Sequence, residues 1–233
     1  MSIDIKICGL KTPEAIAAVL ARGASHVGFI HFPRSPRHLS VEEMAALRPA
    51  VEGAKLVVVT VDADDALIDA ILAQVKPDML QLHGSETPAR VAEIRERSGL
   101  PVIKAISIGS AEDVAGVAAY RDAADLLLLD AKKPKGSDLP GGNGVSFYWA
   151  LLAALDPGLR YMLSGGLDAG NVAAALRQAR PGGVDISSGV ERAPGAKDIG
   201  LIHGFFDVLA AEALQASSPS PQTVRDEPER MIS

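Results

Sequence analysis

One cysteine, Cys8, occurs in the 233 residues of the chain. A single thiol cannot form an intramolecular disulfide, so the sequence predicts a protein of a reducing compartment, the cytoplasm. The chain contains no uninterrupted apolar run of about 18 residues, so no membrane-spanning helix and no membrane partner are predicted. The first residues do not combine a charged region with a long apolar core, so no signal peptide is predicted.

Basic residues are outnumbered by acidic ones, 23 against 29, which gives a formal net charge of -6. This balance does not support a nucleic-acid partner, although a local basic cluster can still hold a small anion. Hydrophobic residues make up 48% of the chain and charged residues 22%, a composition that can bury a sizeable core. The length fits one α/β barrel or two smaller domains and does not choose between them.

Short apolar runs recur along the chain at a spacing of about 25 residues, with helical segments between them. The runs predict eight strands, at residues 3–7, 26–30, 55–61, 79–83, 102–106, 126–130, 161–164 and 184–187. Four consecutive leucines at 126–129 are typical of a parallel strand covered on both faces. Thr12 before Pro13, and Ser40 with Glu43, predict the starts of two helices.

Eight alternating units of strand and helix predict an α/β protein, a closed eight-stranded parallel (β/α)8 TIM barrel. An open doubly wound sheet also alternates strands and helices, but its usual strand count is lower. We expect a single barrel domain over residues 1–214. Residues 215–233 mix serine, proline and charged residues without periodicity and are predicted to form a disordered tail.

Two residues at predicted strand ends, Cys8 and Asp130, carry side chains that suit acid–base chemistry. The catalytic residues of such barrels lie at the carboxyl ends of the strands. Taken alone, Cys8 is more often a small buried apolar residue than a reactive thiol. Asp130 follows four leucines, where burying an unpaired carboxylate would be costly. The alternative for Asp130 is a helix cap or a surface loop residue.

Other loops at the same end of the predicted barrel suit anions. Arg34 and Arg37 offer planar guanidinium groups to a carboxylate or phosphate, or they form a solvated basic turn. The turns at 164–167 and 187–191 contain glycines that let backbone N–H groups approach a phosphate. The loop at 131–144 is rich in lysine and glycine, so it is either a lid over an anionic substrate or a tolerated insertion.

Histidines give weaker signals. His83, after the fourth predicted strand, could titrate or donate a hydrogen bond, but a structural histidine is the more frequent case. The remaining histidines show no ligand spacing with one another, so no metal site is predicted.

Seven short motifs occur in order along the chain. They are Lys6-Ile7-Cys8-Gly9, Gly28-Phe29 with Ser35-Pro36-Arg37, Gln81-Leu82-His83-Gly84, Leu129-Asp130, Gly141-Gly142-Asn143-Gly144, Leu163-Ser164-Gly165-Gly166-Leu167 and Asp185-Ile186-Ser187-Ser188-Gly189-Val190-Glu191. As a set they resemble the phosphoribosylanthranilate isomerase family. The match runs from Ile5 to about Asp198, nearly the whole predicted barrel.

The resemblance implies an Amadori rearrangement of N-(5-phosphoribosyl)anthranilate to the corresponding 1-deoxyribulose phosphate in tryptophan biosynthesis. It implies that Cys8 is the general base, that Asp130 is the general acid and that Arg37 faces the anthranilate carboxylate. The other substrate-binding residues that it implies, with the glycine and serine turns on the phosphate, are Gln81, His83, Gly165, Gly166, Asp185, Ser187, Ser188 and Gly189. We expect no cofactor, no metal, and a monomer or homodimer whose partner is a small phosphorylated substrate.

Two alternatives stand beside the isomerase. A related barrel, the histidine-pathway ribosyl isomerase, is expected to carry an aspartate at the end of the first strand, where this chain has Cys8. The second alternative is a barrel that binds a phosphorylated ligand without turning it over; a missing base or acid would favour it, and both are present. The chemistry agrees with the isomerase, because a carboxylic acid can protonate a ring oxygen and a thiolate, stabilised by a cation such as Lys6, can remove a proton.

Deletion of residues 217–233 is expected to leave the melting temperature and the activity unchanged. The segment has too little apolar content to offset the entropy lost on ordering it. Thermal unfolding of the truncated and full-length proteins measures the effect. A fall of more than a few degrees would show that the segment packs on the barrel.

Overall fold

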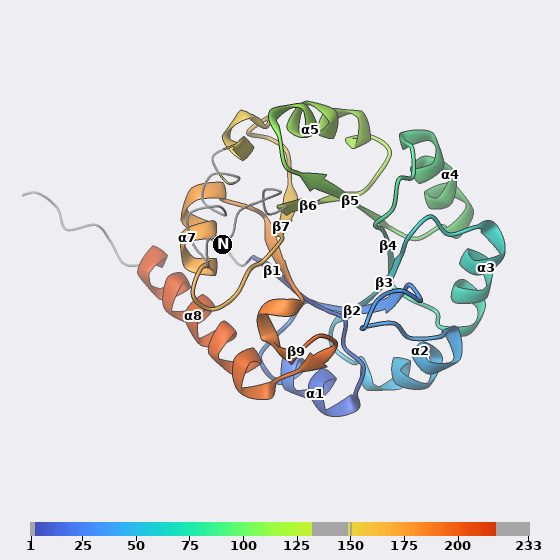
Figure 1. Ribbon diagram of the computed structural model, residues 1–233, viewed down its shortest axis with the longest axis horizontal. Helices are drawn as coiled ribbons and strands as arrows, with labels where there is room; N and C mark the ends of the chain where they lie inside the picture. The colour runs from blue at the N-terminus through green and yellow to red at the C-terminus, as the bar shows by residue number, and fades with distance from the viewer. Residues whose placement is uncertain (1–2, 132–148, 150, 218–233) are drawn as a thin grey trace, which may run out of the picture.

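The computed structural model describes residues 3–131, 149 and 151–217. Eight parallel strands close into a barrel in chain order, each pairing with the next and the last with the first (Figure 1). The strands are β1 (Asp4–Cys8), β2 (His26–His31), β3 (Lys55–Thr60), β4 (Met79–Leu82), β5 (Val102–Ile108), β6 (Leu126–Ala131), β7 (Tyr161–Ser164) and β8 (Gly183–Ile186). The predicted (β/α)8 barrel is confirmed, and the predicted strand boundaries differ from the observed ones by at most two residues.

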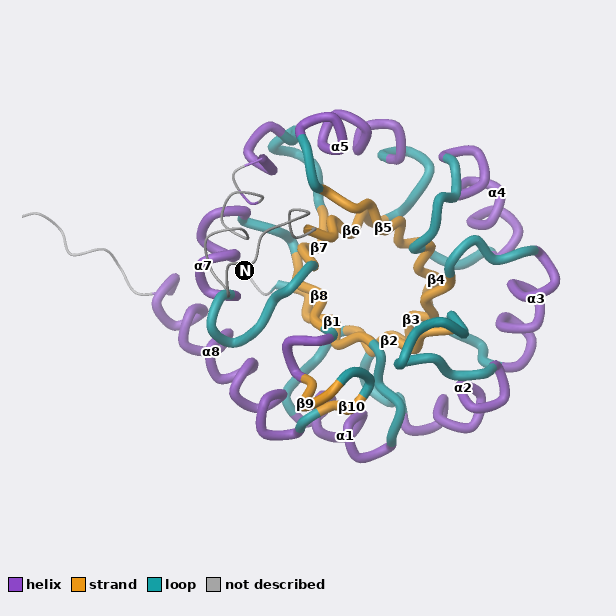
Figure 2. Tube along the Cα trace, in the orientation of Figure 1, coloured by secondary structure: helices purple, strands orange, loops and turns teal. Residues whose placement is uncertain are grey.

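A ring of helices surrounds the barrel (Figure 2). The α-helices are α1 (Pro13–Ala21), α2 (Val41–Leu47), α3 (Asp65–Gln74), α4 (Pro88–Ser98), α5 (Ala111–Gly116), α7 (Val172–Ala179) and α8 (Ile199–Ser217). Short 3-10 helices are η1 (Arg48–Ala50), η2 (Val117–Tyr120), η3 (Leu152–Ala154) and η4 (Ser188–Val190). After η4 the chain forms a small antiparallel hairpin of β9 (Glu191–Ala193) and β10 (Ala196–Lys197).

Two predicted helix starts are confirmed by the hydrogen bonds at the first turns of α1 and α2. The Thr12 side chain accepts from the backbone N–H of Ala15 at 3.3 Å, and Pro13 takes the first position of α1. Ser40 and Glu43 bond reciprocally in a capping box at the start of α2. These contacts satisfy N–H groups that have no partner within the helix.

Strand side chains divide between the barrel interior and the layer beneath the helices, because successive residues of a strand face opposite sides. A small apolar cluster fills the interior and comprises Val57, Met79, Ile103, Ala105, Leu128 and Met162. A larger cluster, which includes Phe29 and Phe205, packs the strands against the helices. Gln81 and Asp130 each follow a member of the interior cluster by two residues, so they face the interior nearer the carboxyl ends. The interior therefore changes from apolar to polar along the barrel.

No helix within the described residues is long and apolar enough to cross a membrane.

Two predicted segments, the lid and the tail, fall wholly or largely outside the described residues. Residues 215–217, which were predicted to begin the disordered tail, are instead the last residues of α8. Residues 132–144, which make up nearly all of the predicted lid, lie outside the described residues, as do residues 218–233 of the predicted tail. The lid and the rest of the tail therefore remain predictions.

Phe205→Ala is expected to lower the free energy of unfolding by about 3–5 kcal/mol, because it opens a cavity between α8 and the barrel. Phe205 is fully buried. The matched control is Leu201→Ala on the same helix, where the side chain is 44% exposed and a change within about 0.5 kcal/mol is expected. Urea unfolding of both variants measures the difference, and equal losses would contradict the packing of α8 through Phe205.

Candidate active site

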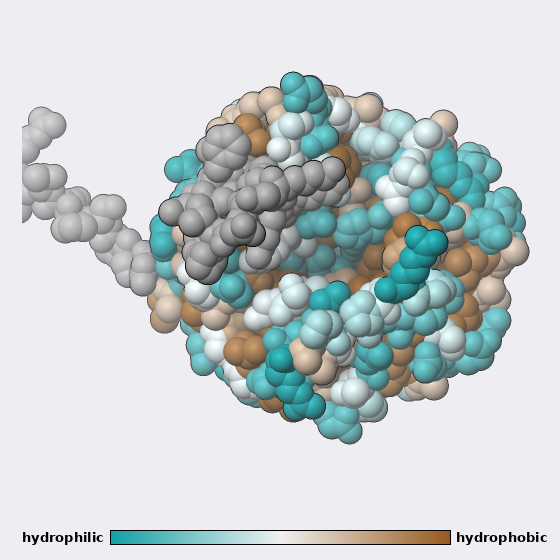
Figure 3. Space-filling model, in the orientation of Figure 1, coloured by the Kyte–Doolittle hydropathy of each residue, from teal (hydrophilic) through white to brown (hydrophobic). Residues whose placement is uncertain are grey.

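A cavity of about 240 Å³ lies at the carboxyl ends of the strands. Hydrophilic residues surround the central hollow on this face (Figure 3). The residues that line the cavity are Cys8, Ile30, Arg37, Val59, Gln81, His83, Asp130, Ser164, Gly165, Gly166, Leu167, Asp185, Ser187 and Ser188. Every residue predicted for the site except Gly189 is therefore brought to one cavity.

A larger groove of about 930 Å³ lies along α7 and α8, beside the start of β1. Its walls are mostly apolar, and two of its three arginines, Arg22 and Arg177, are paired with Asp207 and Glu212. It contains neither the thiol nor the carboxylate–imidazole pair of the smaller cavity. The smaller cavity is therefore the better candidate for acid–base chemistry.

Cys8 ends β1 and is 5% exposed. Burial raises the pKa of the Cys8 thiol above its ordinary value of 9.0; the Lys6 ammonium opposes this shift, and Asp185 adds to it. Lys6 is fully buried on the same face of β1, and its Nζ donates to Oδ1 of Asp185 at 3.0 Å. The predicted cation beside Cys8 is therefore present, but Asp185 shares its charge and the resting group is a thiol.

Asp130 near the end of β6 lies opposite His83, the residue after β4. Nε2 of His83 is 3.5 Å from Oδ2 of Asp130, and the two side chains are 34% and 30% exposed. Nε2 of Gln81 lies 3.3 Å from Nδ1 of His83. With the amide assigned in this orientation, Gln81 donates to Nδ1, which puts the proton of a neutral imidazole on Nε2, toward Asp130. In this tautomer the N–H of His83 faces the Asp130 carboxylate, so the two side chains form one polar pair at the cavity.

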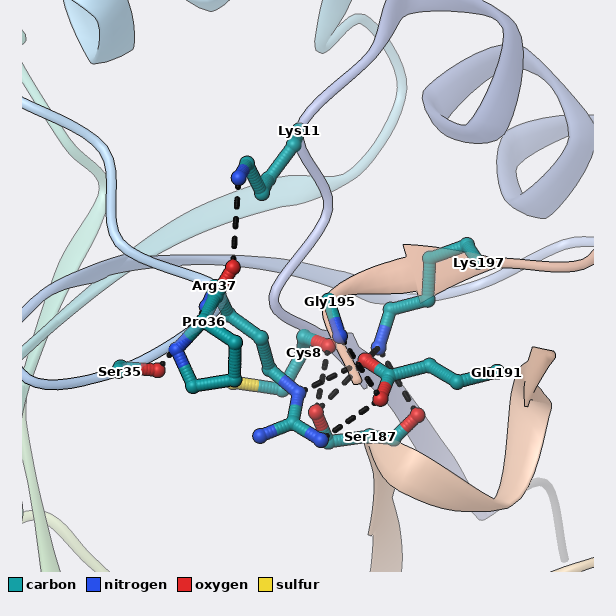
Figure 4. A network of polar contacts seen from close by, with 9 residues as sticks. All are labelled: Cys8, Lys11, Ser35, Pro36, Arg37, Ser187, Glu191, Gly195 and Lys197. Atoms are coloured by element: carbon teal, nitrogen blue, oxygen red, sulfur yellow. Dashed lines mark hydrogen bonds and ion pairs between the residues drawn. The ribbon is translucent and has the colours of Figure 1, made fainter. Parts of the chain in front are cut away.

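Arg37 binds Glu191 through one edge of its guanidinium group. Nε and Nη2 each donate to a Glu191 oxygen at 2.7 Å. The other terminal nitrogen points away from Glu191 (Figure 4). Since a guanidinium group has five N–H donors on its edges, one edge remains for a second carboxylate. The sequence did not predict that Arg37 would share its donors with an acidic residue.

The glycine and serine turns meet beside Cys8. Gly165 and Gly166 have φ of 96° and 63°, the left-handed region that favours glycine. The Ser187 hydroxyl donates to the carbonyl oxygen of Cys8 at 3.0 Å, which fixes the second turn to the end of β1. Ser188, the next residue, lines the cavity and begins η4. The two turns therefore present backbone and hydroxyl groups to the same part of the cavity.

Gly189 lies outside the cavity lining. A Cβ atom added to it would lie 1.9 Å from the carbonyl oxygen of Leu167, closer than any real side chain approaches. The glycine lets the turn after β8 pack against the turn after β7. Gly189 therefore has a packing role in this structure, and its predicted contact with the substrate stays a prediction.

Two charged residues that the sequence assigned no role also belong to the site. Glu191 pairs with Arg37, and Lys197 donates to Glu191 at 2.8 Å and to the carbonyl oxygen of Ser187 at 2.8 Å. Burial acts to raise the pKa of Glu191, but hydrogen bonds from Arg37 and Lys197 outweigh it and hold this pKa at about 2. The signals in the sequence were their position after the eighth strand, on the functional side of the barrel, and for Glu191 its place at the end of the last motif.

No group of three or more His, Cys, Asp or Glu side chains within the described residues is arranged to hold a metal ion. The cavity instead joins a thiol, a carboxylate–imidazole pair, an arginine and two glycine-containing turns. A (β/α)8 barrel with these groups at its carboxyl-terminal mouth is a barrel enzyme for a small anionic substrate.

Comparisons with known proteins identify the family. The model of the N-(5'-phosphoribosyl)anthranilate (PRA) isomerase family matches residues 5–208. A Brucella canis protein named N-(5'-phosphoribosyl)anthranilate isomerase is 60% identical over 211 residues, which cover 90% of this chain and 95% of that protein. The chain belongs to the phosphoribosylanthranilate isomerase family.

Solved structures agree with this assignment. A structure of mutually generated monomers of dimeric phosphoribosylanthranilate isomerase from Thermotoga maritima aligns with a TM-score of 0.78 and 30% identity, covering 90% of this chain and all of that one. A phosphoribosylanthranilate isomerase in complex with reduced 1-(o-carboxyphenylamino)-1-deoxyribulose 5-phosphate aligns with a TM-score of 0.76 and 30% identity, covering 90% of this chain and 100% of that chain.

Alkylation of Cys8 by iodoacetamide is expected to accelerate with pH through a pKa above 9.0, because burial disfavours the thiolate that reacts. Lys6→Met should move the profile to still higher pH, since it removes a cation that stabilises the thiolate and leaves Asp185 unpaired. Cys8 is the only cysteine, so the mass of the labelled protein reports this site alone. A profile centred below 9.0, or one that Lys6→Met leaves in place, would contradict this electrostatic arrangement.

Proposed function

We propose that this cavity isomerises N-(5-phosphoribosyl)anthranilate with Cys8 as general base and Asp130 as general acid. The chain is a phosphoribosylanthranilate isomerase of tryptophan biosynthesis, as its 60% identity to the Brucella canis enzyme and its family model indicate. The observation that supports the residue roles is that one cavity gathers the thiol, the Asp130–His83 pair, Arg37 and the two turns.

Asp130 would supply the first proton. Opening the ring of the substrate requires a proton on the ring oxygen as the C–O bond breaks, and the nitrogen lone pair then forms an iminium ion. A carboxylic acid can donate this proton. The Asp130 side chain is 30% exposed, so the carboxylate can regain a proton from solvent between turnovers.

Cys8 would act in the next step. The iminium ion makes the C–H bond at C2 acidic, and the thiolate removes this proton to give an enolamine, which becomes the ketone by moving a proton from oxygen to carbon. Electrons only move within the substrate, so the balance needs no cofactor or metal. The raised pKa of Cys8 makes the thiolate scarce but also makes it the stronger base once formed.

The two ends of the substrate would be held by opposite sides of the cavity. The open edge of Arg37 suits the planar carboxylate of the anthranilate ring, because two parallel N–H bonds can form. The phosphate suits the turns that contain Gly165, Gly166, Ser187 and Ser188. The open edge of Arg37 thus offers local donors to an anionic group, although the whole chain carries a formal net charge of -6.

The proposal includes a cytoplasmic location for the protein and a monomeric or homodimeric assembly. The single cysteine supports a cytoplasmic protein. The Thermotoga maritima relative is described both as dimeric and as generated monomers, which supports either a monomer or a homodimer for this chain.

Cys8→Ala and Asp130→Asn are each expected to cut turnover by at least about 100-fold, the lower range for general acid or base catalysis. Cys8→Ser should be similarly impaired, because a hydroxyl gives up its proton far less readily than a thiol. The assay follows the loss of fluorescence of freshly prepared N-(5-phosphoribosyl)anthranilate, with circular dichroism as the control for folding.

Full activity in Cys8→Ser, with a lower melting temperature, would return Cys8 to a packing role. Full activity in Asp130→Asn would remove Asp130 as the acid and leave His83 as the proton donor to test next. Either result would leave the family assignment intact, since that rests on the whole barrel.

A further inference from the structure

Glu191, the first residue of β9, accepts four hydrogen bonds in the buried wall beside the cavity (Figure 4). Oε1 accepts from Nε of Arg37 at 2.7 Å and from Nζ of Lys197 at 2.8 Å. Oε2 accepts from Nη2 of Arg37 at 2.7 Å and from the N–H of Gly195 at 3.2 Å. A carboxylate has about four lone-pair sites, so Glu191 has no acceptor left for a substrate.

The Lys197 arm of this network reaches the phosphate turn. Nζ of Lys197 donates to the Ser187 carbonyl oxygen at 2.8 Å and lies 3.3 Å from its hydroxyl. That hydroxyl in turn donates to the Cys8 carbonyl oxygen. A continuous chain of hydrogen bonds therefore runs from Arg37 through Glu191 and Lys197 to Ser187 and the end of β1.

Each charged side chain in this network is compensated by an oppositely charged partner. The Glu191 and Lys197 side chains are each 3% exposed, and the Arg37 side chain is 20% exposed. Removing Glu191 leaves two cations without their carboxylate partner, whereas removing either cation leaves Glu191 paired with the other. Two cations share one carboxylate, and of the three residues Arg37 lines the cavity. The geometry of the network is fixed by the bonds of Glu191 to both cations.

We propose that Glu191 is a positioning residue that couples the two ends of the substrate site. It fixes the guanidinium of Arg37 so that its open edge receives the substrate carboxylate, and through Lys197 it fixes the Ser187 turn that receives the phosphate. This inference rests on the proposed function for the roles of Arg37 and Ser187. It differs from a simple ion pair that closes the β9–β10 hairpin, because such a pair would affect stability without affecting both ends of the ligand.

The test measures dissociation constants for two probes, anthranilate and inorganic phosphate, in full-length variants by calorimetry. Arg37→Ala should weaken anthranilate by about 10-fold or more and leave phosphate within about twofold. Lys197→Met should weaken phosphate binding by about 10-fold or more and leave anthranilate binding within about twofold. Glu191→Gln should weaken both probes by about 10-fold or more, although Glu191 touches neither.

Two further variants keep the experiment interpretable. The double variant Glu191→Gln, Lys197→Met removes an anion and a cation together, so the fold is left without an unpaired buried lysine, and it should still weaken both probes. Asp78→Asn is the matched control, because Asp78 binds the Arg48 guanidinium just before β4, at the opposite end of that strand from the cavity. It should change stability and neither affinity.

The outcomes separate this inference from the proposed function. A loss of affinity for both anthranilate and phosphate in Glu191→Gln and in the double variant supports the coupling. If Arg37→Ala and Lys197→Met behave as expected but Glu191→Gln loses affinity for only one probe, or for neither, the coupling alone is overturned. If Arg37→Ala leaves anthranilate affinity unchanged, the binding role of Arg37 is wrong and the coupling falls with it.

Discussion

The closure of eight parallel strands is the constraint on which the other features depend. Since side chains alternate along a strand, closure sorts them into an interior and an outer layer, and the pairing register sets which residues share a level. Lys6 pairs with Asp185 across β1 and β8, and Asp130 pairs with Ser164 across β6 and β7. Strand pairing alone therefore brings each of these two pairs together, although its members lie far apart in the chain.

Buried ion pairs then hold the loops that the barrel leaves free. Glu86 accepts from Lys104 at 2.6 Å and from the N–H of Gly84 at 3.0 Å, which fixes the loop that carries His83. Glu191 does the same for the loop of Arg37. Breaking a buried pair by removing one partner costs about 3–5 kcal/mol, so these loops are held at energies comparable with a large core side chain.

The sequence predicted the features that depend on local pattern. The four leucines before Asp130 predicted a buried strand, and Ser40 with Glu43 predicted a helix start, because each signal lies within a few residues. The bond between Arg37 and Glu191 spans 154 residues of sequence, and no local pattern encodes which two distant charges will meet. The packing of Gly189 depends in the same way on the distance between two turns.

The pKa of Cys8 is a quantity that the sequence alone cannot give. A neighbouring lysine suggested a stabilised thiolate, but the balance between burial, Lys6 and Asp185 depends on the folded environment, and burial is the largest contribution.

That burial has a consequence for the lifetime of the enzyme. Oxidants attack a thiolate much faster than a thiol, so a thiol that is 5% exposed with a raised pKa resists oxidation to sulfenic acid. The chain has no second cysteine that could capture a sulfenic acid as an intramolecular disulfide. Repair of an oxidised Cys8 would need a thiol from outside the chain, so the buried position of Cys8 protects a residue that the protein cannot rescue by itself.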